Sequence, residues 1–283
     1  MNFVTFQIGD EPPRPGMINH HSIADFGDLG YPDLLAYIRA GHPYGMRNPP
    51  IRTNPNGYQL GGKVRLLAPI PNPPRIFGIG LNYRDHAAES KMQLPSAPTV
   101  FLKLASSVIG CYEPVRLPSL TQQPDYEVEL AVVIGKPGRN IPKENWRDHV
   151  FGYTILNDVS ARDIQFSTSQ WTLAKSFDTF CPIGPAIVTA DRIPDPHALD
   201  IQLRIGSEVL QHSNTRELIF QIPDLIAYIS SITALQTGDI ISTGTPAGVG
   251  FARNPQRWLQ PGDKMTAEIE HIGQLINPVV AGE

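Results

Sequence analysis

Two glutamates interrupt a run of apolar residues that is otherwise typical of a buried β-strand. The segment DYEVELAVVIGK, residues 125–136, carries Glu127 and Glu129 among valine, leucine, isoleucine and alanine. Because side chains alternate along a strand, residues two apart project from the same face. Like charges held at this spacing repel each other and resist burial. The pair therefore predicts a positive partner, either a basic side chain or a divalent cation.

A third acid follows the next apolar segment. VFGYTILNDVSARD, residues 150–163, is a second strand-like run in which polar residues take over at Asn157 and Asp158. At the end of a strand beside Glu127 and Glu129, Asp158 would complete a set of three carboxylates. Hard oxygen ligands, completed by water, suit Mg²⁺ or Mn²⁺. Paired glutamates are also common on exposed strand faces, so these residues alone leave a metal site and a solvated strand face as alternatives.

Two basic residues follow the third acid, and each has two interpretations. Arg162 is placed either to steer an anionic substrate or only to hold one of the acids. Lys175 lies in WTLAKSF, an otherwise uncharged segment flanked by aromatic residues. A lysine in this context either reaches solvent from the surface or holds a carboxylate or enolate oxygen. The residue types alone favour the surface position for Lys175.

A candidate general base lies upstream of these acids. GIGLNYRDHAAES predicts a strand, a turn and a short helix with Asn82 as its N-cap. His86 and Glu89 are three residues apart and so share one face of that helix. A histidine held by a glutamate is a competent general base, although a pair at this spacing is more often a plain surface contact. Downstream, STGTPAGVG (residues 242–250) predicts a tight turn whose backbone amides either cradle a carboxylate or do nothing more than turn the chain.

The sequence lacks the motifs of several common enzyme classes. GIGLNY begins like a dinucleotide-binding loop, but Tyr83 stands where the third glycine would be. The chain also lacks a phosphate-binding GxxxxGK[ST] loop, a GxSxG elbow and an HExxH zinc motif. These absences argue against NAD-dependent, ATP-dependent, serine-hydrolase and zinc-protease activities.

Composition indicates a folded protein and leaves small-molecule substrates open. Hydrophobic residues make up 41% and charged residues 18% of 283, and the formal net charge is −4, so neither nucleic acid nor a membrane is an expected partner. Only two cysteines occur, and neither a signal-peptide pattern nor a run of about 18 apolar residues is present. We expect a cytoplasmic protein, or a mitochondrial one if a transit segment is missing from the sequence.

The order of the elements predicts a β-rich fold with a small leading domain. Proline, at 28 residues, divides the chain into many short strands and few helices, which favours a sandwich or closed roll. MNFVTFQIGD alternates like an edge strand, and YPDLLAYIRAG and PDLIAYISSI predict short helices. A stretch rich in glycine, proline and asparagine places a domain boundary near residue 70, between a small N-terminal domain and linker (1–70) and a catalytic domain (71–283).

Taken together, these motifs resemble the fumarylacetoacetate hydrolase family. They run in the family's order from about residue 75 to 280, and the series is more specific than any one motif. The segments DTFCPIGPAIVT and AGVGFARNP are most similar to the branch of small two-domain proteins that includes oxaloacetate tautomerases. WTLAKSF is also similar to the branch of oxaloacetate decarboxylases and acylpyruvases. The segments that carry the resemblance are GLNYRDHAAE, FLKLASSVIG, DYEVELAVVIGK, GYTILNDVSARDIQ, WTLAKSFDTFCPIGPAIVT, SNTRELIF, LQTGDIISTGTPAGVG and IEHIGQLIN.

The resemblance implies a fold, a metal and a set of site residues. The fold would be α+β and β-rich, a mixed β-sandwich or roll of the fumarylacetoacetate hydrolase C-terminal type with a small N-terminal domain, usually as a homodimer. One Mg²⁺ or Mn²⁺ would be held by Glu127, Glu129 and Asp158. Arg84 departs from the small or apolar residues common at its position, where a charge would touch the substrate or face water. The implied catalytic residues are His86, Glu89 and Lys175, and the implied substrate-binding residues are Arg162, Gln165, Gly244 and Thr245.

The implied activity is metal-dependent enolisation of a 2-oxo acid such as oxaloacetate, either as a keto–enol tautomerase or as a decarboxylase. The alternative is a hydrolase that splits a C–C bond of acylpyruvates or other 2,4-diketo acids. A catalytically silent binding protein is the third and least favoured interpretation. The three bond changes would use the same residues, because each passes through an enolate stabilised by a cation, so the sequence leaves them unresolved.

Overall fold

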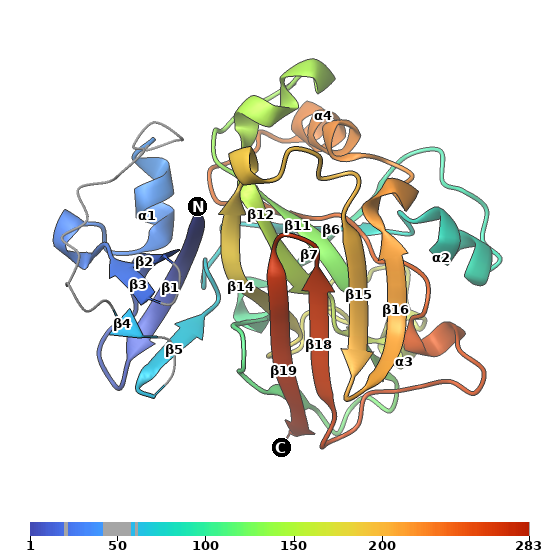
Figure 1. The fold of residues 1–283 in the computed structure, drawn as a ribbon. Helices are drawn as coiled ribbons and strands as arrows, with labels where there is room; N and C mark the ends of the chain where they lie inside the picture. The colour runs from blue at the N-terminus through green and yellow to red at the C-terminus, as the bar shows by residue number, and fades with distance from the viewer. Residues whose placement is uncertain (20–21, 42–57, 60–61, 283) are drawn as a thin grey trace.

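One long sheet runs through most of the computed structural model, which describes residues 1–19, 22–41, 58–59 and 62–282 (Figure 1). Its strands are β1 (Asn2–Ile8), β2 (Arg14–Asn19), β3 (Ser22–Asp25), β4 (Tyr58–Gln59), β5 (Val64–Leu67), β6 (Ile76–Gly80), β7 (Thr99–Lys103), β8 (Val108–Ile109), β11 (Val128–Ile134), β12 (Val150–Asn157), β14 (Cys181–Thr189) and β17 (Ile240–Ser242). Their order is β4-β3-β2-β1-β14-β12-β11-β17-β6-β7, with β5 beside β1 and β8 beside β14. Strand β7 therefore lies at one edge.

A second, five-stranded sheet packs across the middle of the first. Its order is β16-β15-β18-β19-β9, and it lies over β11, β12 and β14 (Figure 1). All seven residues of β11 are buried, because neighbouring strands and the second sheet enclose it. This arrangement confirms the predicted β-rich, sandwich-like class. The strands of the second sheet are β9 (Val115–Leu117), β15 (Asp200–Ile205), β16 (Glu208–Asn214), β18 (Lys264–Ile269) and β19 (Gly273–Ala281), and a separate short pair consists of β10 (Pro124–Asp125) and β13 (Ser160–Ala161).

The helices are short, as the frequent prolines predict. The α-helices within the described ranges are α1 (Leu34–Arg39), α2 (Arg84–Glu89), α3 (Arg162–Gln165) and α4 (Ile222–Ile232). Helix α4 begins with a capping box and packs on a 3₁₀ helix, Lys143–His149. None of the helices described is long and apolar enough to cross a membrane.

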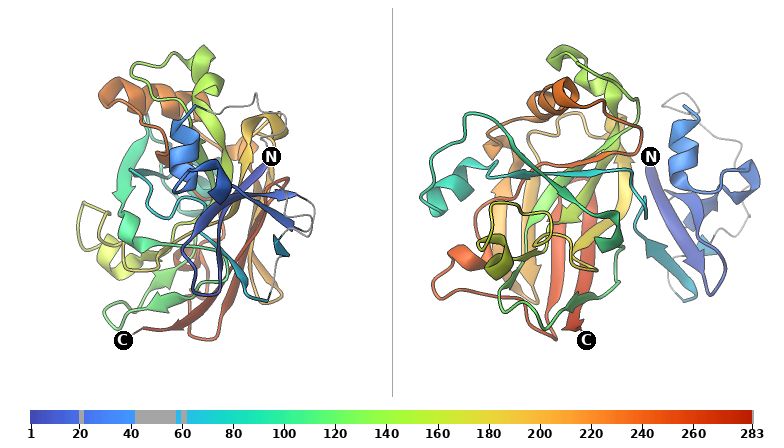
Figure 2. Two further views of the ribbon diagram at one scale, coloured as in Figure 1. Left: turned by 90° about the vertical axis from the view of Figure 1, so that its left-hand side faces the viewer. Right: turned by 180° about the vertical axis from the view of Figure 1, so that it is seen from behind.

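The first strand lies inside the sheet, so the prediction of an edge strand is wrong. β1 pairs with β2 and β5 and, through Asn2 and Phe3, with β14. Alternation identified the strand but carried no information about its neighbours. The first strands and α1 stand to one side of the sandwich in Figure 1 and in the right-hand view of Figure 2. The boundary near residue 70 stays a prediction.

Phe3 joins the leading strands to the rest of the protein. Its buried ring lies 5.9 Å from Phe26, 5.4 Å from Tyr37 and 5.3 Å from Phe151 on β12, measured between ring centroids. Aromatic pairs at these separations add to the free energy gained by burial.

We expect Phe3→Ala to lower the free energy of unfolding by about 3–5 kcal/mol, because it leaves a cavity among three rings. Urea titration followed by tryptophan fluorescence measures this change. Ile232→Ala is the control, since Ile232 is 63% exposed and its replacement should alter stability by no more than about 0.5 kcal/mol. Equal losses in the two variants would contradict the packing role of Phe3.

Candidate active site

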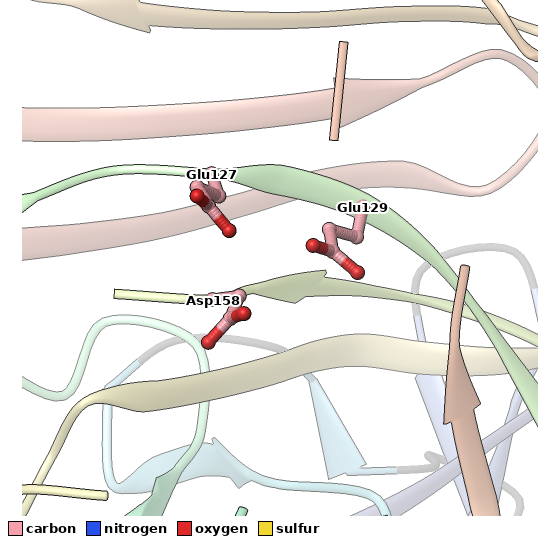
Figure 3. A group of neighbouring side chains, drawn as sticks. All are labelled: Glu127, Glu129 and Asp158. Atoms are coloured by element: carbon pink, nitrogen blue, oxygen red, sulfur yellow. The ribbon is translucent and has the colours of Figure 1, made fainter. Parts of the chain in front are cut away.

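The register of two neighbouring strands brings three acids together. β11 and β12 are antiparallel with Val128 opposite Asn157, so the start of one strand meets the end of the other. Glu127 directly precedes β11, Glu129 lies within it, and Asp158 directly follows β12. The two glutamates project from the same side of their strand, towards the end of the strand that carries Asp158 (Figure 3). One oxygen from each carboxylate lies within 4.8 Å of the others, and all three side chains are buried.

Glu127 and Asp158 are neutralised by basic side chains. Lys175 Nζ lies 2.8 Å from Glu127 Oε2 and 2.7 Å from Asp158 Oδ2 and so bridges the two acids. Arg162 Nη2 lies 2.5 Å from the other oxygen of Glu127. Burial alone would raise the pKa of Glu127, but the charges of Arg162 and Lys175 outweigh it and hold that pKa well below its ordinary value.

Glu129 differs from the other two acids because its hydrogen-bond donors are neutral. Its Oε2 accepts from Ser242 Oγ at 2.6 Å and from the backbone N–H of Gly244 at 2.8 Å. Within the described ranges it forms no salt bridge. Burial, followed by the charges of Asp158 and Glu127, raises the pKa of Glu129 to about 8. Without a cation beside it, Glu129 therefore favours its protonated, neutral form.

The three acids fit a hard divalent cation. Oxygens that bind Mg²⁺ at roughly 2.1 Å stand about 3–4 Å apart, which small side-chain rotations would reach from the observed separations. A cation would also supply the positive charge that Glu129 lacks, and three carboxylates leave coordination positions for water or substrate oxygens. The donor set therefore suits Mg²⁺ or Mn²⁺.

The two downstream basic residues are buried, and both serve the acids. Lys175 is only 2% exposed, so the surface position that its sequence context favours is wrong. Arg162, also 2% exposed, pairs with Asp125 through Nε at 2.9 Å as well as with Glu127. Its Nη1 donates to Gln165 Oε1 at 2.8 Å. The amide nitrogen of Gln165 is thereby turned away from Arg162.

Sequence reasoning missed Lys103, the last residue of β7. Its ammonium lies 2.6 Å from Asp158 Oδ1, and it also donates to the backbone carbonyls of Val159 and Lys175. The side chain is 3% exposed. A charge at an inward-facing position of an apolar strand was the available signal, and it is the signal that drew attention to Glu127 and Glu129.

His86 and Glu89 lie on α2 as predicted, and His86 is buried. His86 Nδ1 is 3.4 Å from Glu89 Oε2, at the long end of hydrogen-bond distances. The backbone N–H of Gly248 lies 3.0 Å from each oxygen of Glu89 and holds the carboxylate in place. The alternative of a plain surface contact is therefore wrong for His86.

The predicted helix cap at Asn82 is wrong. Tyr83 occupies the N-cap of α2 without a side-chain bond. Asn82 is buried and instead donates to the carbonyls of Thr243 and Phe220, because the turn that precedes α2 crosses these distant segments. Arg84 is exposed and donates to the carbonyl of Leu218 at 2.8 Å. It is not among the described residues that line the small cavity beside the three acids.

One small cavity, of about 90 Å³, collects most of these groups. Four aromatic rings and Met92 contribute to its lining, which limits access of water. Two larger cavities, of about 450 and 630 Å³, have one described acidic residue each in their lining and thus lack a comparable cluster. The polar groups that line the small cavity include His86, Glu127, Glu129, Arg162, Gln165, Lys175 and Thr245.

The turn that follows β17 does cradle carboxylates, but they belong to the protein. Gly244 donates to Glu129 and Gly248 donates to Glu89. Thr245 Oγ accepts from Gln211 at 2.8 Å and donates to the carbonyl of Val128 at 3.0 Å. Because the N–H of Gly244 is already used, a substrate carboxylate would need other donors.

Comparison with known proteins places this arrangement in a family. Residues 75–280 match the family model for the fumarylacetoacetate hydrolase C-terminal domain. Mitochondrial oxaloacetate tautomerase fahd2 of Xenopus laevis is 43% identical over 99% of this chain and 90% of its own length. A fumarylacetoacetate hydrolase structure from Exiguobacterium antarcticum is 36% identical, with a TM-score of 0.87 over 99% of both chains. A maleylpyruvate hydrolase from Sphingobium sp. SYK-6, solved with manganese(II) and pyruvate, is 33% identical, with a TM-score of 0.83 over 100% of both chains.

We expect Glu129→Gln to weaken Mn²⁺ binding about 100-fold or more, because it removes one anionic ligand and keeps an oxygen that can accept from Ser242 and Gly244. Isothermal titration calorimetry measures the affinity. Glu268→Gln is the matched control, since Glu268 accepts only from glutamine amides outside the site in the bonds that the structure gives. Unchanged Mn²⁺ affinity in Glu129→Gln would remove this residue from the ligand set.

Proposed function

The chain belongs to the fumarylacetoacetate hydrolase family of enzymes, and on that premise we propose that it interconverts the keto and enol forms of a 2-oxo diacid such as oxaloacetate. The observation that carries the proposal is that two acids of the triad, Glu127 and Glu129, line one cavity together with a buried lysine and a histidine. The similarity to an oxaloacetate tautomerase along nearly the whole chain supports this substrate class.

In the proposed site, Glu127, Glu129 and Asp158 hold the cation. When bound, Mg²⁺ or Mn²⁺ supplies Lewis acidity that stabilises negative charge developing on a substrate oxygen. The manganese named with the similar maleylpyruvate hydrolase supports a divalent metal of this kind. Lys175 bridges the carboxylates of Glu127 and Asp158 and so keeps a second positive charge close to the proposed position of the cation.

His86 is the proposed general base. With Glu89 accepting from Nδ1–H, Nε2 carries the lone pair and can take a proton. Removal of a proton from C3 of the substrate and its return to the 2-oxo oxygen gives the enol, and the reverse transfer gives the keto form. The 3.4 Å separation of His86 and Glu89 can shorten when substrate fills the cavity.

The remaining polar groups orient the substrate. The amide nitrogen of Gln165, fixed by Arg162, is a donor for a carboxylate. Arg162 contributes positive charge, and Thr245 lines the same cavity. Phe101, Phe166, Trp171 and Phe251 line the cavity as well, and a low-dielectric lining strengthens each of these interactions.

C–C hydrolysis of an acylpyruvate-like 2,4-diketo acid is the second candidate. The similarity to a maleylpyruvate hydrolase favours it. In this reaction His86 would take a proton from water, and the hydroxide would add to the C4 carbonyl. Decarboxylation would need no base for C–C cleavage. The catalytically silent interpretation is set aside, because the relatives that match are named as enzymes.

One assay separates these outcomes. The protein is loaded with Mg²⁺ and given oxaloacetate or acetylpyruvate, while enol absorbance, CO₂ and acetate are followed separately. Faster loss of enol without release of CO₂ supports the tautomerase. Acetate release from acetylpyruvate indicates the hydrolase, and CO₂ release indicates a decarboxylase. Inertness towards both substrates would contradict the proposed function.

We expect His86→Ala to lower kcat for tautomerisation by about 100- to 10,000-fold, the usual contribution of a positioned general base. Mn²⁺ affinity should change little, because His86 is not a ligand. Enol absorbance gives the rate and calorimetry gives the affinity. A fully active His86→Ala variant would rule out His86 as the base.

The homodimer expected from the sequence has a candidate surface on β7. Val100 and Leu102 on this edge strand, and Leu104 directly after it, are 37%, 42% and 45% exposed and alternate with inward-facing residues. Leu173, which is 73% exposed, lies in a turn next to these residues. A hydrogen bond from the N–H of Leu104 to Ser176 Oγ holds this turn against the end of β7. Monomeric proteins seldom leave such a patch uncovered, so a second copy of the chain is the proposed partner.

We expect Leu102→Lys to convert the dimer to a monomer, because it places a charge in the apolar patch. Size-exclusion chromatography with light scattering measures the mass. Ile232→Lys, on α4, is the control and should leave the dimer intact. A wild-type protein that elutes as a monomer would contradict the dimer itself.

The cellular location of the protein stays a prediction. The Xenopus relative is named as mitochondrial, which supports the second of the two locations expected from the sequence. Fractionation of cells that express the full-length protein separates a mitochondrial location from a cytoplasmic one.

A further inference from the structure

The turn Gly248–Phe251 binds two carboxylates that belong to different parts of the site. The N–H of Gly248 lies 3.0 Å from both oxygens of Glu89, the partner of His86. Two residues later, the N–H groups of Gly250 and Phe251 donate to Asp125 at 2.7 and 3.1 Å. Asp125 in turn pairs with Arg162. The same few residues of backbone therefore support both the candidate base and the acid cluster.

The ring of Phe251 lies between these two parts. The guanidinium carbon of Arg162 is 4.6 Å from the centre of the ring, a cation–π contact. The rings of Phe251 and His86 have centroids 6.1 Å apart and planes at 81°, an edge-to-face arrangement. Phe251 also lines the cavity. One side chain thus contacts the candidate base and the arginine that pairs with Glu127.

The turn has little room to adjust independently of its neighbours. A Cβ on Gly250 would lie 2.1 Å from the carbonyl oxygen of Arg257 and 2.5 Å from Asp125 Oδ1. Gly248 has φ of +100°, and a Cβ there would lie 2.0 Å from the carbonyl oxygen of Leu210. Close packing of this kind transmits a displacement instead of absorbing it.

We propose that Phe251 is a positioning residue that couples His86 to the carboxylate cluster, so that occupation of the cluster by a cation also fixes the candidate base. The proposal rests on the proposed function for the roles of the cation and of His86. The contacts run from Glu127 through Arg162 and Phe251 to His86, and in parallel from Arg162 through Asp125 and the turn to Glu89. Through them, an ordered cluster restrains α2.

The test compares amide hydrogen exchange in α2, residues 84–89, with and without Mn²⁺ and without substrate. In the wild type, Mn²⁺ should slow exchange in α2. Phe251→Leu keeps an apolar side chain but loses the ring, and it should abolish this Mn²⁺-induced protection. It should also weaken Mn²⁺ binding about tenfold, a size typical of coupling between residues in one network. Phe251→Tyr keeps the ring and should restore both effects.

The control is Phe77→Leu, which removes another ring that contacts an arginine, with the guanidinium carbon of Arg75 5.1 Å from the ring centre. It should keep the Mn²⁺-induced protection of α2. The coupling is wrong if the wild-type protein binds Mn²⁺ but exchange in α2 is not slowed. It is also wrong if the Phe251→Leu variant shows the same Mn²⁺-induced protection of α2 as the wild type. Either result leaves the proposed function standing. Wild-type protein that binds no Mn²⁺ overturns the proposed metal site and the coupling with it.

Discussion

Negative charge buried beside an apolar sheet is the constraint on which this structure depends. Four carboxylates, those of Asp125, Glu127, Glu129 and Asp158, are buried, and burial of an ionised group without compensation is costly. Three buried cationic groups, those of Lys103, Arg162 and Lys175, compensate part of this negative charge. With all four carboxylates ionised, one negative charge would be left over, and it would fall on Glu129, whose donors are neutral. A divalent ion bound beside the three acids would compensate this charge.

The sheets supply the positions that this chemistry requires. Antiparallel pairing of β11 and β12 sets the start of one strand against the end of the other, which brings Asp158 to the glutamates. The segment after β17 then approaches with its backbone N–H groups, which needs glycine. At Gly244, with φ of +99°, a Cβ would lie 2.8 Å from the Cβ of Asn82. The rigid strands therefore hold the ligands, while the turn completes their hydrogen bonding.

Alternation and the ends of apolar runs predicted the strands and the side of each strand on which the acids lie. Alternation placed Glu127 and Glu129 on one face, and the end of an apolar run made Asp158 a candidate third acid. That the three acids converge was implied by the family resemblance and depends on the pairing of β11 with β12. The partners of these acids come from far along the chain. Lys103 is 55 residues from Asp158 in sequence, and no periodicity within its own strand identifies that pairing. The surface position expected for Lys175 and the cap expected at Asn82 failed for the same reason, since each side chain bonds to a distant segment.

The two faces of strand β7 lie in different environments, one towards the active site and one towards the exterior. Phe101 lines the cavity and Lys103 pairs with Asp158, whereas Val100 and Leu102 face outwards. Because this division follows the two-residue repeat of the strand, a deletion of one residue there would exchange the two sets of side chains. It would send the ammonium group to the exterior and place leucine beside Asp158. A change in the length of this segment would therefore disturb the acid cluster and the outward-facing apolar patch at once.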